Sequence, residues 1–332
     1  MKRDSRIELL RIFLMFGIVM LHCAQETIGS STWERNICKW CVDGFALITG
    51  YFGISRFSFK KVSRLYVMAI VCLLMIECAR FFHPDESGAC FSLREVWHCF
   101  CDLWFLHAYV LLMLMAPFVN LAAESRHRFE FLVPFCAVIL VWGLLGELPV
   151  IGKVMFKTSG VESLSGLTLL VAYAVGRLYR ICGWQVKIKP WWVYTVLPVL
   201  LFICCFGIHN PKNGDWNSGW FGSYSSPFAV VTAVCFLHIF NRMVVPKSLE
   251  RLILLVSPSM FPVYVLHLHP VVFERMTQTG RTWTAQFPDL PALLVLASIT
   301  FVFCIGIDLL RRAVVMSFCG RNHYAPSKRN LG

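Results

Sequence analysis

The sequence has few charged side chains. Only 15% of its 332 residues are Asp, Glu, Lys or Arg, whereas 57% are hydrophobic, and the mean hydropathy is +0.64. A soluble domain carries about 25% charged residues, so a water-facing domain of this size would lack the polar side chains to cover its surface. The composition therefore excludes an ordinary soluble protein and predicts a polytopic membrane protein, with the lipid bilayer as its main partner.

Acidic residues are also scarce, at 19 against 31 Lys and Arg, which gives a formal net charge of +12. Such a charge would suit a nucleic-acid-binding protein. The basic residues, however, fall in short clusters between apolar runs, and in a membrane protein this pattern reflects topology. We therefore expect no nucleic-acid partner.

Several catalytic signatures are absent. The sequence holds no G-x-S-x-G, no H-E-x-x-H and no G-x-x-x-x-G-K-[ST], which disfavours a serine hydrolase, a zinc protease and a nucleotide-driven pump. Cys38 and Cys41 form a C-x-x-C pair without a second ligand pair at suitable spacing. Many other cysteines lie inside apolar runs, where a thiol behaves as a small hydrophobe. No metal site and no tightly bound cofactor are predicted.

Apolar runs fill most of the chain. About 20 helical residues cross 30 Å of hydrocarbon, and on this basis we predict an all-α membrane bundle of about ten transmembrane helices, forming one domain over residues 1–332. No internal repeat and no loop long enough for a soluble catalytic domain is found. The predicted spans are 7–24, 37–55, 63–82, 103–121, 129–148, 164–182, 191–209, 226–245, 252–273 and 291–317.

Alternate connections between these spans differ in charge. If the N-terminus is cytoplasmic, most Lys and Arg residues fall in cytoplasmic segments, and every cytoplasmic segment obeys the positive-inside rule. We therefore expect an even number of spans, with the N- and C-termini both in the cytoplasm.

The first predicted span carries two ionisable residues on one face. Arg11 and His22 are 11 positions apart, and 11 steps of 100° make three turns plus about 20°, over a rise of about 16 Å. An ionisable residue within a span is costly unless it faces a cavity or a partner. Arg11 taken alone also fits snorkelling to headgroups with pairing to Glu8, and His22 alone fits the outer interface. The pair on one face favours a functional site.

Other polar residues mark the ends of the next spans. Asp43 begins the second span, and the turn that follows concentrates Lys60, Lys61 and Arg64 at helix ends. Such a cluster suits a phosphate-bearing ligand, although positive-inside topology explains each cation equally well. Asp102 and Trp104 lie near the outer end of the fourth span, a common place for interfacial belt residues.

The ninth span contains His267 and His269. On one helix these two side chains would point 200° apart, so they cannot bind a single metal ion together. We expect one of them to face the interior of the bundle and the other to lie at the membrane interface.

Five segments carry a recognisable pattern. They are Arg11-x10-His22 (R-x10-H), residues 42–51 (V-D-x-F-F-x-x-S-G-F), residues 104–120 (W-F-L…S-P-F-x-N), Tyr224 to Phe228 (Y-x-S-P) and Tyr264 to His267 (Y-L-I-H). In this order they resemble the acyltransferase 3 family of integral membrane acyltransferases. Two departures are that Ala46 stands where the family has an aromatic residue and Thr49 where it has a serine; Thr49 keeps the hydroxyl group.

This resemblance implies transfer of an acyl group, usually acetyl, from cytoplasmic acetyl-CoA or another acyl-CoA to a hydroxyl of a glycan or lipid-linked sugar. The acyl-CoA would be a donor substrate, and the chain would be the stand-alone form of the family, located in the plasma (inner) membrane. The alternative is a secondary transporter or flippase for a lipid-linked sugar. Such proteins often show repeated halves, which this sequence lacks.

The acyltransferase hypothesis assigns a role to each polar residue. His22 is the general base towards the acceptor hydroxyl, and Thr49 bonds the acceptor or the developing oxyanion. Asp43 and Asp102 orient the imidazole. The phosphates of the donor are held by Arg11, Lys60, Lys61 and Arg64, and the acceptor site is lined by Asp102, Trp104 and His267.

Overall fold

The computed structural model is helical through nearly all of the residues it describes, so the prediction of an all-α fold is confirmed. The only strands among them are β1 (Ile208–His209) and β2 (Trp216–Asn217), which pair antiparallel. Tyr224 and Ser225 of the predicted Y-x-S-P segment lie outside the described residues. The structure describes residues 3–28, 33–82, 91–146, 165–206, 208–209, 216–217 and 226–319.

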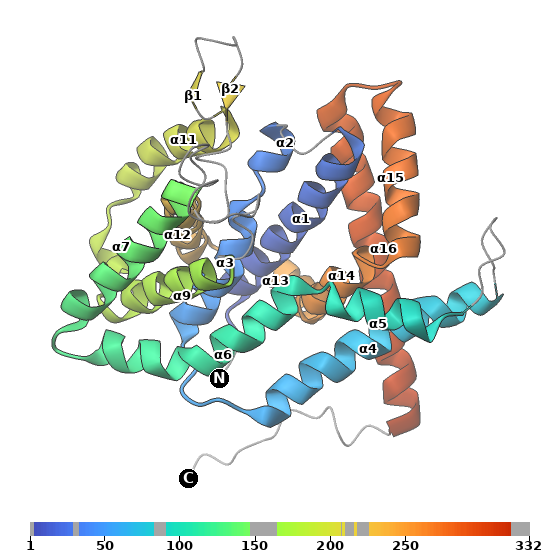
Figure 1. Cartoon of the computed structure of the whole chain (residues 1–332), viewed down its shortest axis with the longest axis horizontal. Coiled ribbons are helices and arrows are strands. Elements are labelled where there is room, and N and C mark those ends of the chain that lie inside the picture. Colours follow the sequence, from blue (N-terminus) through green and yellow to red (C-terminus); the bar gives the residue numbers. More distant parts are fainter. Residues whose placement is uncertain are drawn as a thin grey trace.

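Figure 1 shows how the helices are arranged in space. In chain order they are α1 (Ser5–Thr27), α2 (Trp33–Asn36), α3 (Trp40–Phe52), α4 (Phe59–Phe82), α5 (Leu93–Cys101), α6 (Trp104–Glu124), α7 (Arg128–Gly146), α9 (Ser165–Ile181), α10 (Trp184–Lys187), α11 (Pro190–Phe206), α12 (Pro227–Arg242), α13 (Lys247–Val256), the 3₁₀ turn η2 (Ser257–Ser259), α14 (Met260–His267), α15 (Pro270–Thr284) and α16 (Asp289–Cys319).

Five helical segments among the described residues are long and apolar enough to cross a membrane. The other apolar helices include α3 and α12, which at 13 and 16 residues are shorter than the roughly 20 residues of a full span. The number of about ten spans, and the cytoplasmic position of both termini, stay predictions. The five segments are Ser5–Thr27, Phe59–Arg80, Trp104–Glu124, Lys247–His267 and Asp289–Ser317.

The predicted span 252–273 is divided into several pieces. It begins within α13, passes through η2 and α14, and continues into α15. Pro258 lies in η2 and Pro270 is the first residue of α15; proline lacks a backbone N–H and restricts the residue before it, which favours a break in the helix. Consequently His267 and His269 lie on opposite sides of a break and do not follow the geometry of one helix.

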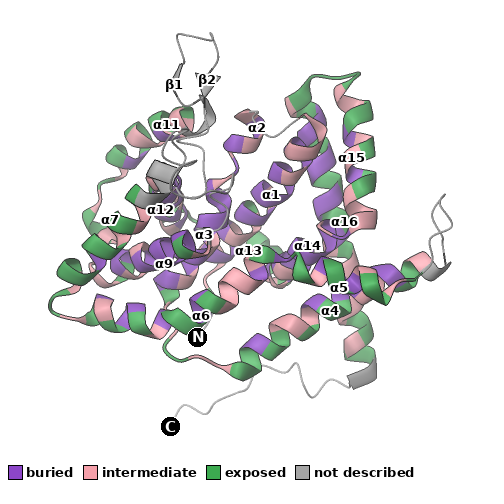
Figure 2. Ribbon diagram, in the orientation of Figure 1, coloured by how far each residue is buried: buried purple, intermediate pink, exposed green. Residues whose placement is uncertain are grey.

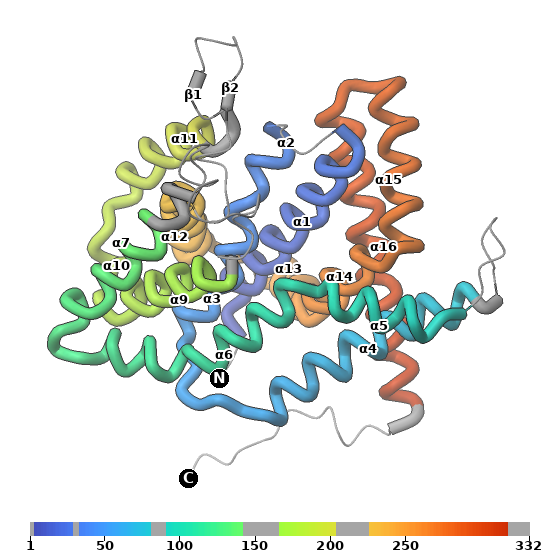
Figure 3. The backbone as a smooth tube through the Cα atoms, in the orientation of Figure 1, coloured from blue at the N-terminus to red at the C-terminus, as the bar shows by residue number. Residues whose placement is uncertain are grey.

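Helix α1 is the most central element. It contacts α3, α12, α13, α14, α15 and α16, and most of its length is buried (Figure 2). The side chain of Asp4 accepts a hydrogen bond from the Arg6 backbone N–H at 3.0 Å, which caps the helix N-terminus. On one side of α1, helices α15 and α16 pack against each other after a short turn (Figure 3). A side chain on α1 is therefore surrounded by elements distant in sequence.

Helices α3 and α9 are in direct backbone contact. A Cβ atom at Gly50 would lie 2.0 Å from the Tyr173 carbonyl oxygen, and one at Gly176 would lie 2.1 Å from the Leu47 carbonyl oxygen. Only glycine permits this approach, which is a common packing device in membrane helices. The contact fixes α3, which carries Asp43 and Thr49.

A set of hydrogen bonds among Asn120, Tyr173 and Ile54 holds the turn after α3. The Asn120 side-chain amide donates to the Ile54 carbonyl at 2.8 Å, and its oxygen accepts from the Tyr173 hydroxyl at 2.9 Å. That hydroxyl in turn accepts from the Ile54 backbone N–H at 2.8 Å. The three residues thereby connect α6 and α9 to the start of the segment that leads to Lys60 and Lys61.

The outer faces of several helices are apolar and exposed. On α6 the exposed side chains recur every three or four residues, which places them on one face, and α16 shows the same pattern. A contiguous apolar surface of this kind suits contact with lipid. The exposed residues are Leu111, Leu114, Met115, Phe118 and Leu121 on α6 and Val295, Ile299, Val302 and Phe303 on α16.

Candidate functional site

Two histidines from distant parts of the chain meet beside α1. The ring centroids of His22, on α1, and His267, the last residue of α14, are 5.3 Å apart with an interplanar angle of 49°. Phe273 lies 6.3 Å from the His22 ring, and Tyr264 lies 6.2 Å from the His267 ring. The structure therefore brings together two of the residues singled out from the sequence.

The hydrogen bonding of His267 fixes its tautomer. Its side chain is fully buried, and Nδ1 lies 2.7 Å from the Val263 carbonyl oxygen one turn earlier. A carbonyl oxygen only accepts, so Nδ1 carries the proton and Nε2 holds a lone pair. Within the described residues this Nε2 has no hydrogen-bond partner. His22, by contrast, is partly exposed.

Asp43 is buried on α3, with 1% of its surface exposed, and its Oδ2 has no hydrogen-bond partner within the part of the chain that the structure describes. Around it α1 and α3 pack closely, because a Cβ atom at Gly44 would lie 2.6 Å from a Leu14 methyl carbon and one at Gly17 would lie 2.5 Å from the Cys41 sulfur. The orientation of the His22 imidazole by Asp43 stays a prediction.

The Thr49 hydroxyl is already engaged. It donates to the Phe45 carbonyl at 2.8 Å and lies 3.2 Å from the Tyr109 hydroxyl of α6. A threonine hydroxyl has one proton, so Tyr109 is the donor in the second contact. Thr49 would have to release Phe45 before it could donate to an oxyanion, and its predicted role requires that exchange.

Arg11 forms the ion pair that its spacing allows. Its guanidinium donates to Glu8 Oε1 at 2.9 Å, and the carboxylate belongs to a buried side chain. The same guanidinium lies 5.7 Å from the centroid of the Phe52 ring, within the range of a cation–π contact. The pairing with Glu8 therefore offsets the Arg11 charge in this state of the protein.

The remaining predicted site residues lie on the surface. Lys60, Lys61 and Arg64 are exposed in the first turns of α4. Asp102 is exposed at the C-cap of α5, and Trp104 is exposed at the first residue of α6. The next residue, Phe105, reaches inward, where its ring centroid lies 5.6 Å from that of Tyr264. This contact links the W-F-L segment to the surroundings of His267.

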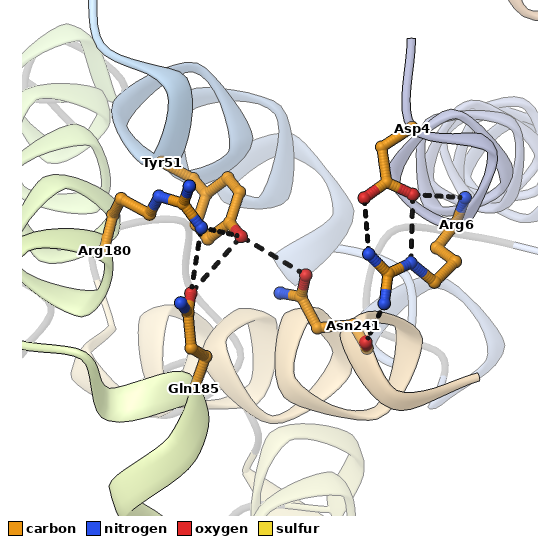
Figure 4. Close-up of polar contacts among 6 residues, drawn as sticks. All are labelled: Asp4, Arg6, Tyr51, Arg180, Gln185 and Asn241. Carbon is orange, nitrogen blue, oxygen red and sulfur yellow. Dashed lines mark hydrogen bonds and ion pairs between the residues drawn. The ribbon is translucent and has the colours of Figure 1, made fainter. Parts of the chain in front are cut away.

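A second polar cluster, around Arg180, was not predicted from the sequence. The Arg180 guanidinium donates to the Tyr51 hydroxyl at 2.9 Å and lies 5.0 Å from the centroid of the Tyr51 ring (Figure 4). The Tyr51 hydroxyl is in turn 3.3 Å from the Gln185 side-chain oxygen. Nearby, Arg6 donates to the Asn241 carbonyl at 2.7 Å. These bonds join α3 to α9 and α10, and α1 to α12, at one end of the bundle.

His269 has a different environment from His267. Its Nε2 lies 3.2 Å from Glu77 Oε1, and both side chains are fully buried. Its Nδ1 accepts from the Val271 backbone N–H at 3.4 Å, while Glu77 Oε2 accepts from the Ser92 N–H at 3.1 Å. Both histidines are buried within the protein, on either side of a helix break, and the expectation that one of them lies at the membrane interface stays a prediction.

Among the described residues, no three His, Cys, Asp or Glu side chains are grouped so that they could hold a metal ion. The histidine pair consists of two imidazoles, and each neutral imidazole has one N–H donor and one nitrogen lone pair. Such an arrangement can accept, hold and return a proton.

Comparison with known proteins gives one match. A family model described as an acyltransferase domain, that of the acyltransferase 3 family, matches residues 4–310. No curated protein and no solved structure matches the chain. The matched range contains both histidines of the pair and every predicted site residue.

Proposed function

The chain belongs to the acyltransferase 3 family, and on this premise we propose that it transfers an acyl group, acetyl first among the candidates, from acyl-CoA to a hydroxyl of a glycan or lipid-linked sugar. The apolar helices and the family support a membrane location. We assign the protein to the plasma membrane, with both termini in the cytoplasm where acyl-CoA is available.

The observation that carries this proposal is the environment of His22. Its imidazole is partly exposed, on the most central helix, beside a second imidazole. Transfer to a hydroxyl requires a base within hydrogen-bond reach of that hydroxyl. A neutral histidine is suited to the task.

The reaction balances with one base. The acceptor hydroxyl oxygen attacks the thioester carbonyl carbon, the C–O bond forms and the hydroxyl proton moves to His22. The C–S bond then breaks, and the CoA thiolate takes the proton from His22 to leave as a thiol. His22 returns to its neutral form, so the products are an ester and free CoA.

The donor would approach from the end of α1 that carries Arg11. The axial rise from Arg11 to His22 is about 16 Å, comparable to the pantetheine arm of CoA. Because Glu8 offsets the charge of Arg11, the exposed cations Lys60, Lys61 and Arg64 are the main candidates for binding the phosphates.

The test is label transfer from radioactive acetyl-CoA by the purified protein in nanodiscs that contain membrane glycolipid. His22→Ala should abolish transfer and leave acetyl-CoA binding in place. His127→Gln is the matched control, because this histidine is exposed and pairs with Glu130 at 3.0 Å on the surface; it should transfer at the wild-type rate.

Two results would contradict the proposal. One is a wild-type protein that neither binds nor turns over any short acyl-CoA with glycolipid present; movement of a fluorescent lipid-linked sugar across the same bilayer would then establish the transporter alternative. The other is full transfer by His22→Ala.

A further inference from the structure

We propose that His267 is the positioning residue of His22. In this assignment the Nε2 lone pair of His267 accepts a hydrogen bond from one ring nitrogen of His22. That bond fixes which nitrogen of His22 is the base and stabilises the imidazolium after proton transfer. The inference rests on the proposed function of His22 as the base.

The tautomer of His267 is the first step of the argument. Its Nδ1–H donates to the Val263 carbonyl at 2.7 Å, on the same helix and four residues earlier. This bond leaves Nε2 as the only nitrogen of the ring with a free lone pair. His267 therefore meets its neighbours as an acceptor.

The second step is the state of that acceptor. Buried polar atoms in native structures are nearly always hydrogen-bonded, yet Nε2 of this fully buried residue has no partner among the described residues. The buried Nε2 of His238 is likewise without a partner there, so a missing partner alone does not mark a catalytic residue. At His267 it is combined with a second imidazole whose ring centroid is 5.3 Å away, and a positioning residue forms its second bond with that ring during turnover.

The third step is reach. The centroids of the two rings are 5.3 Å apart, a separation that allows two ring nitrogens to approach to about 3 Å when one ring turns edge-on to the other, which is hydrogen-bond distance. In the structure the rings are tilted by 49° and this bond is not made. The proposed bond requires the His22 ring to turn so that one of its N–H groups faces His267 Nε2.

The fourth step is the order of burial. His22 is partly exposed and His267 is fully buried behind it, so His22 meets the acceptor hydroxyl and His267 acts through His22. During turnover the hydroxyl proton moves to one nitrogen of His22 while the N–H of the other nitrogen stays bonded to His267 Nε2. When the thiolate takes the proton, both imidazoles return to their neutral forms.

The experiment compares three substitutions of His267 by kcat, by KM for acetyl-CoA and by thermal unfolding in detergent. His267→Asn keeps a donor near Val263 and removes Nε2, His267→Gln returns a polar group near the Nε2 position, and His267→Ala leaves space for free imidazole. The matched control is His269→Ala, a buried histidine in a charged environment.

We expect His267→Asn to remain folded, with kcat about 100-fold lower and KM within about twofold. Free imidazole should restore part of the kcat of His267→Ala and none of any loss in His269→Ala. The double variant His22→Ala/His267→Asn should be no slower than His22→Ala alone, because residues that act as a unit are not additive.

Wild-type kcat in a folded His267→Asn would overturn the assignment. So would the absence of imidazole rescue in a folded His267→Ala. If His267→Asn does not fold, the other two variants decide. A structural role predicts that free imidazole has no effect on the kcat of His267→Ala, and that the kcat of His267→Gln equals that of the wild type. A failure of the proposed function gives a different result: the wild type would not turn over acyl-CoA, or His22→Ala would retain full transfer.

Discussion

Two buried histidines, two residues apart in the chain, have opposite surroundings. His269 faces the carboxylate of Glu77 at 3.2 Å, and Arg80 donates to the same carboxylate at 3.3 Å. His267 faces another imidazole, with 5.3 Å between the ring centroids. The difference teaches that burial alone does not identify a functional histidine. His269 lies in a buried cluster with a carboxylate and an arginine, which suits a structural role, whereas the neighbour of His267 is a second imidazole that can exchange a proton.

The sharpest way to break this comparison is to substitute asparagine at each position. His267→Asn should lower kcat about 100-fold or more, with a melting temperature close to that of the wild type. His269→Asn should mainly lower the melting temperature, because it removes a partner of a buried carboxylate. Transfer assays and thermal unfolding of both variants check this. The comparison is refuted if His269→Asn mainly lowers kcat and His267→Asn mainly lowers the melting temperature.

Glu77→Gln tests the charged member of the His269 environment. Removing one partner from a buried ion pair costs about 3 to 5 kcal/mol of unfolding free energy, since Arg80 and His269 would lose a carboxylate inside the protein. Denaturant unfolding in mild detergent measures it. Glu130→Gln is the control, because its pair with His127 is exposed and should change stability by less than 1 kcal/mol. If the two substitutions change the free energy of unfolding equally, the buried pair contributes no more to stability than the exposed one.

The same contrast applies to the cations. Lys60, Lys61 and Arg64 are exposed, whereas Arg11 has Glu8. Replacing the three exposed residues with alanine should raise the KM for acetyl-CoA about tenfold with little change in kcat, which is the result of losing uniform binding. The difference in KM between the wild type and this triple variant should be smaller at 1 M salt, where electrostatic screening is strong. A change in kcat alone would place these cations outside the donor site.

The smallest effect concerns a surface ion pair. The hydrogen bond and charge of Arg6, at 2.7 Å, hold the pKa of Asp4 below its ordinary value of 3.8. Because the folded-state pKa is depressed, this pair stabilises the fold above about pH 4 and the contribution is lost as the pH falls through the folded-state pKa. We expect less than 1 kcal/mol, seen as a flatter pH dependence of unfolding between pH 5 and about 2 for Asp4→Asn. An identical profile would contradict this.

Hydropathy predicted the positions of the long helices well, because α1, α6 and α16 consist of apolar runs that a spanning helix requires. It missed α15, which carries Glu274, Arg275, Gln278 and Arg281. This helix packs through Met276 and Gly280, and a Cβ atom at Gly280 would lie 2.4 Å from the Thr27 hydroxyl oxygen. A polar helix that docks through a narrow face leaves little signal in an average over 19 residues.

The candidate site was predictable only in part. Helical periodicity placed Arg11 and His22 on one face, since both lie on the same helix. The approach of His267 depends on the breaks at η2 and after α14, and the roles of Asn120 and Arg180 depend on contacts with residues more than 50 positions away. Local sequence patterns do not encode such distances.

The glycine contact between α3 and α9 has a mechanical consequence. With no side-chain layer between the two backbones at Gly50 and Gly176, neither helix can slide or roll against the other without a collision of main-chain atoms. The two helices therefore move as one rigid body. An opening between helices that admits an acceptor must therefore displace this body as a whole or occur elsewhere in the bundle.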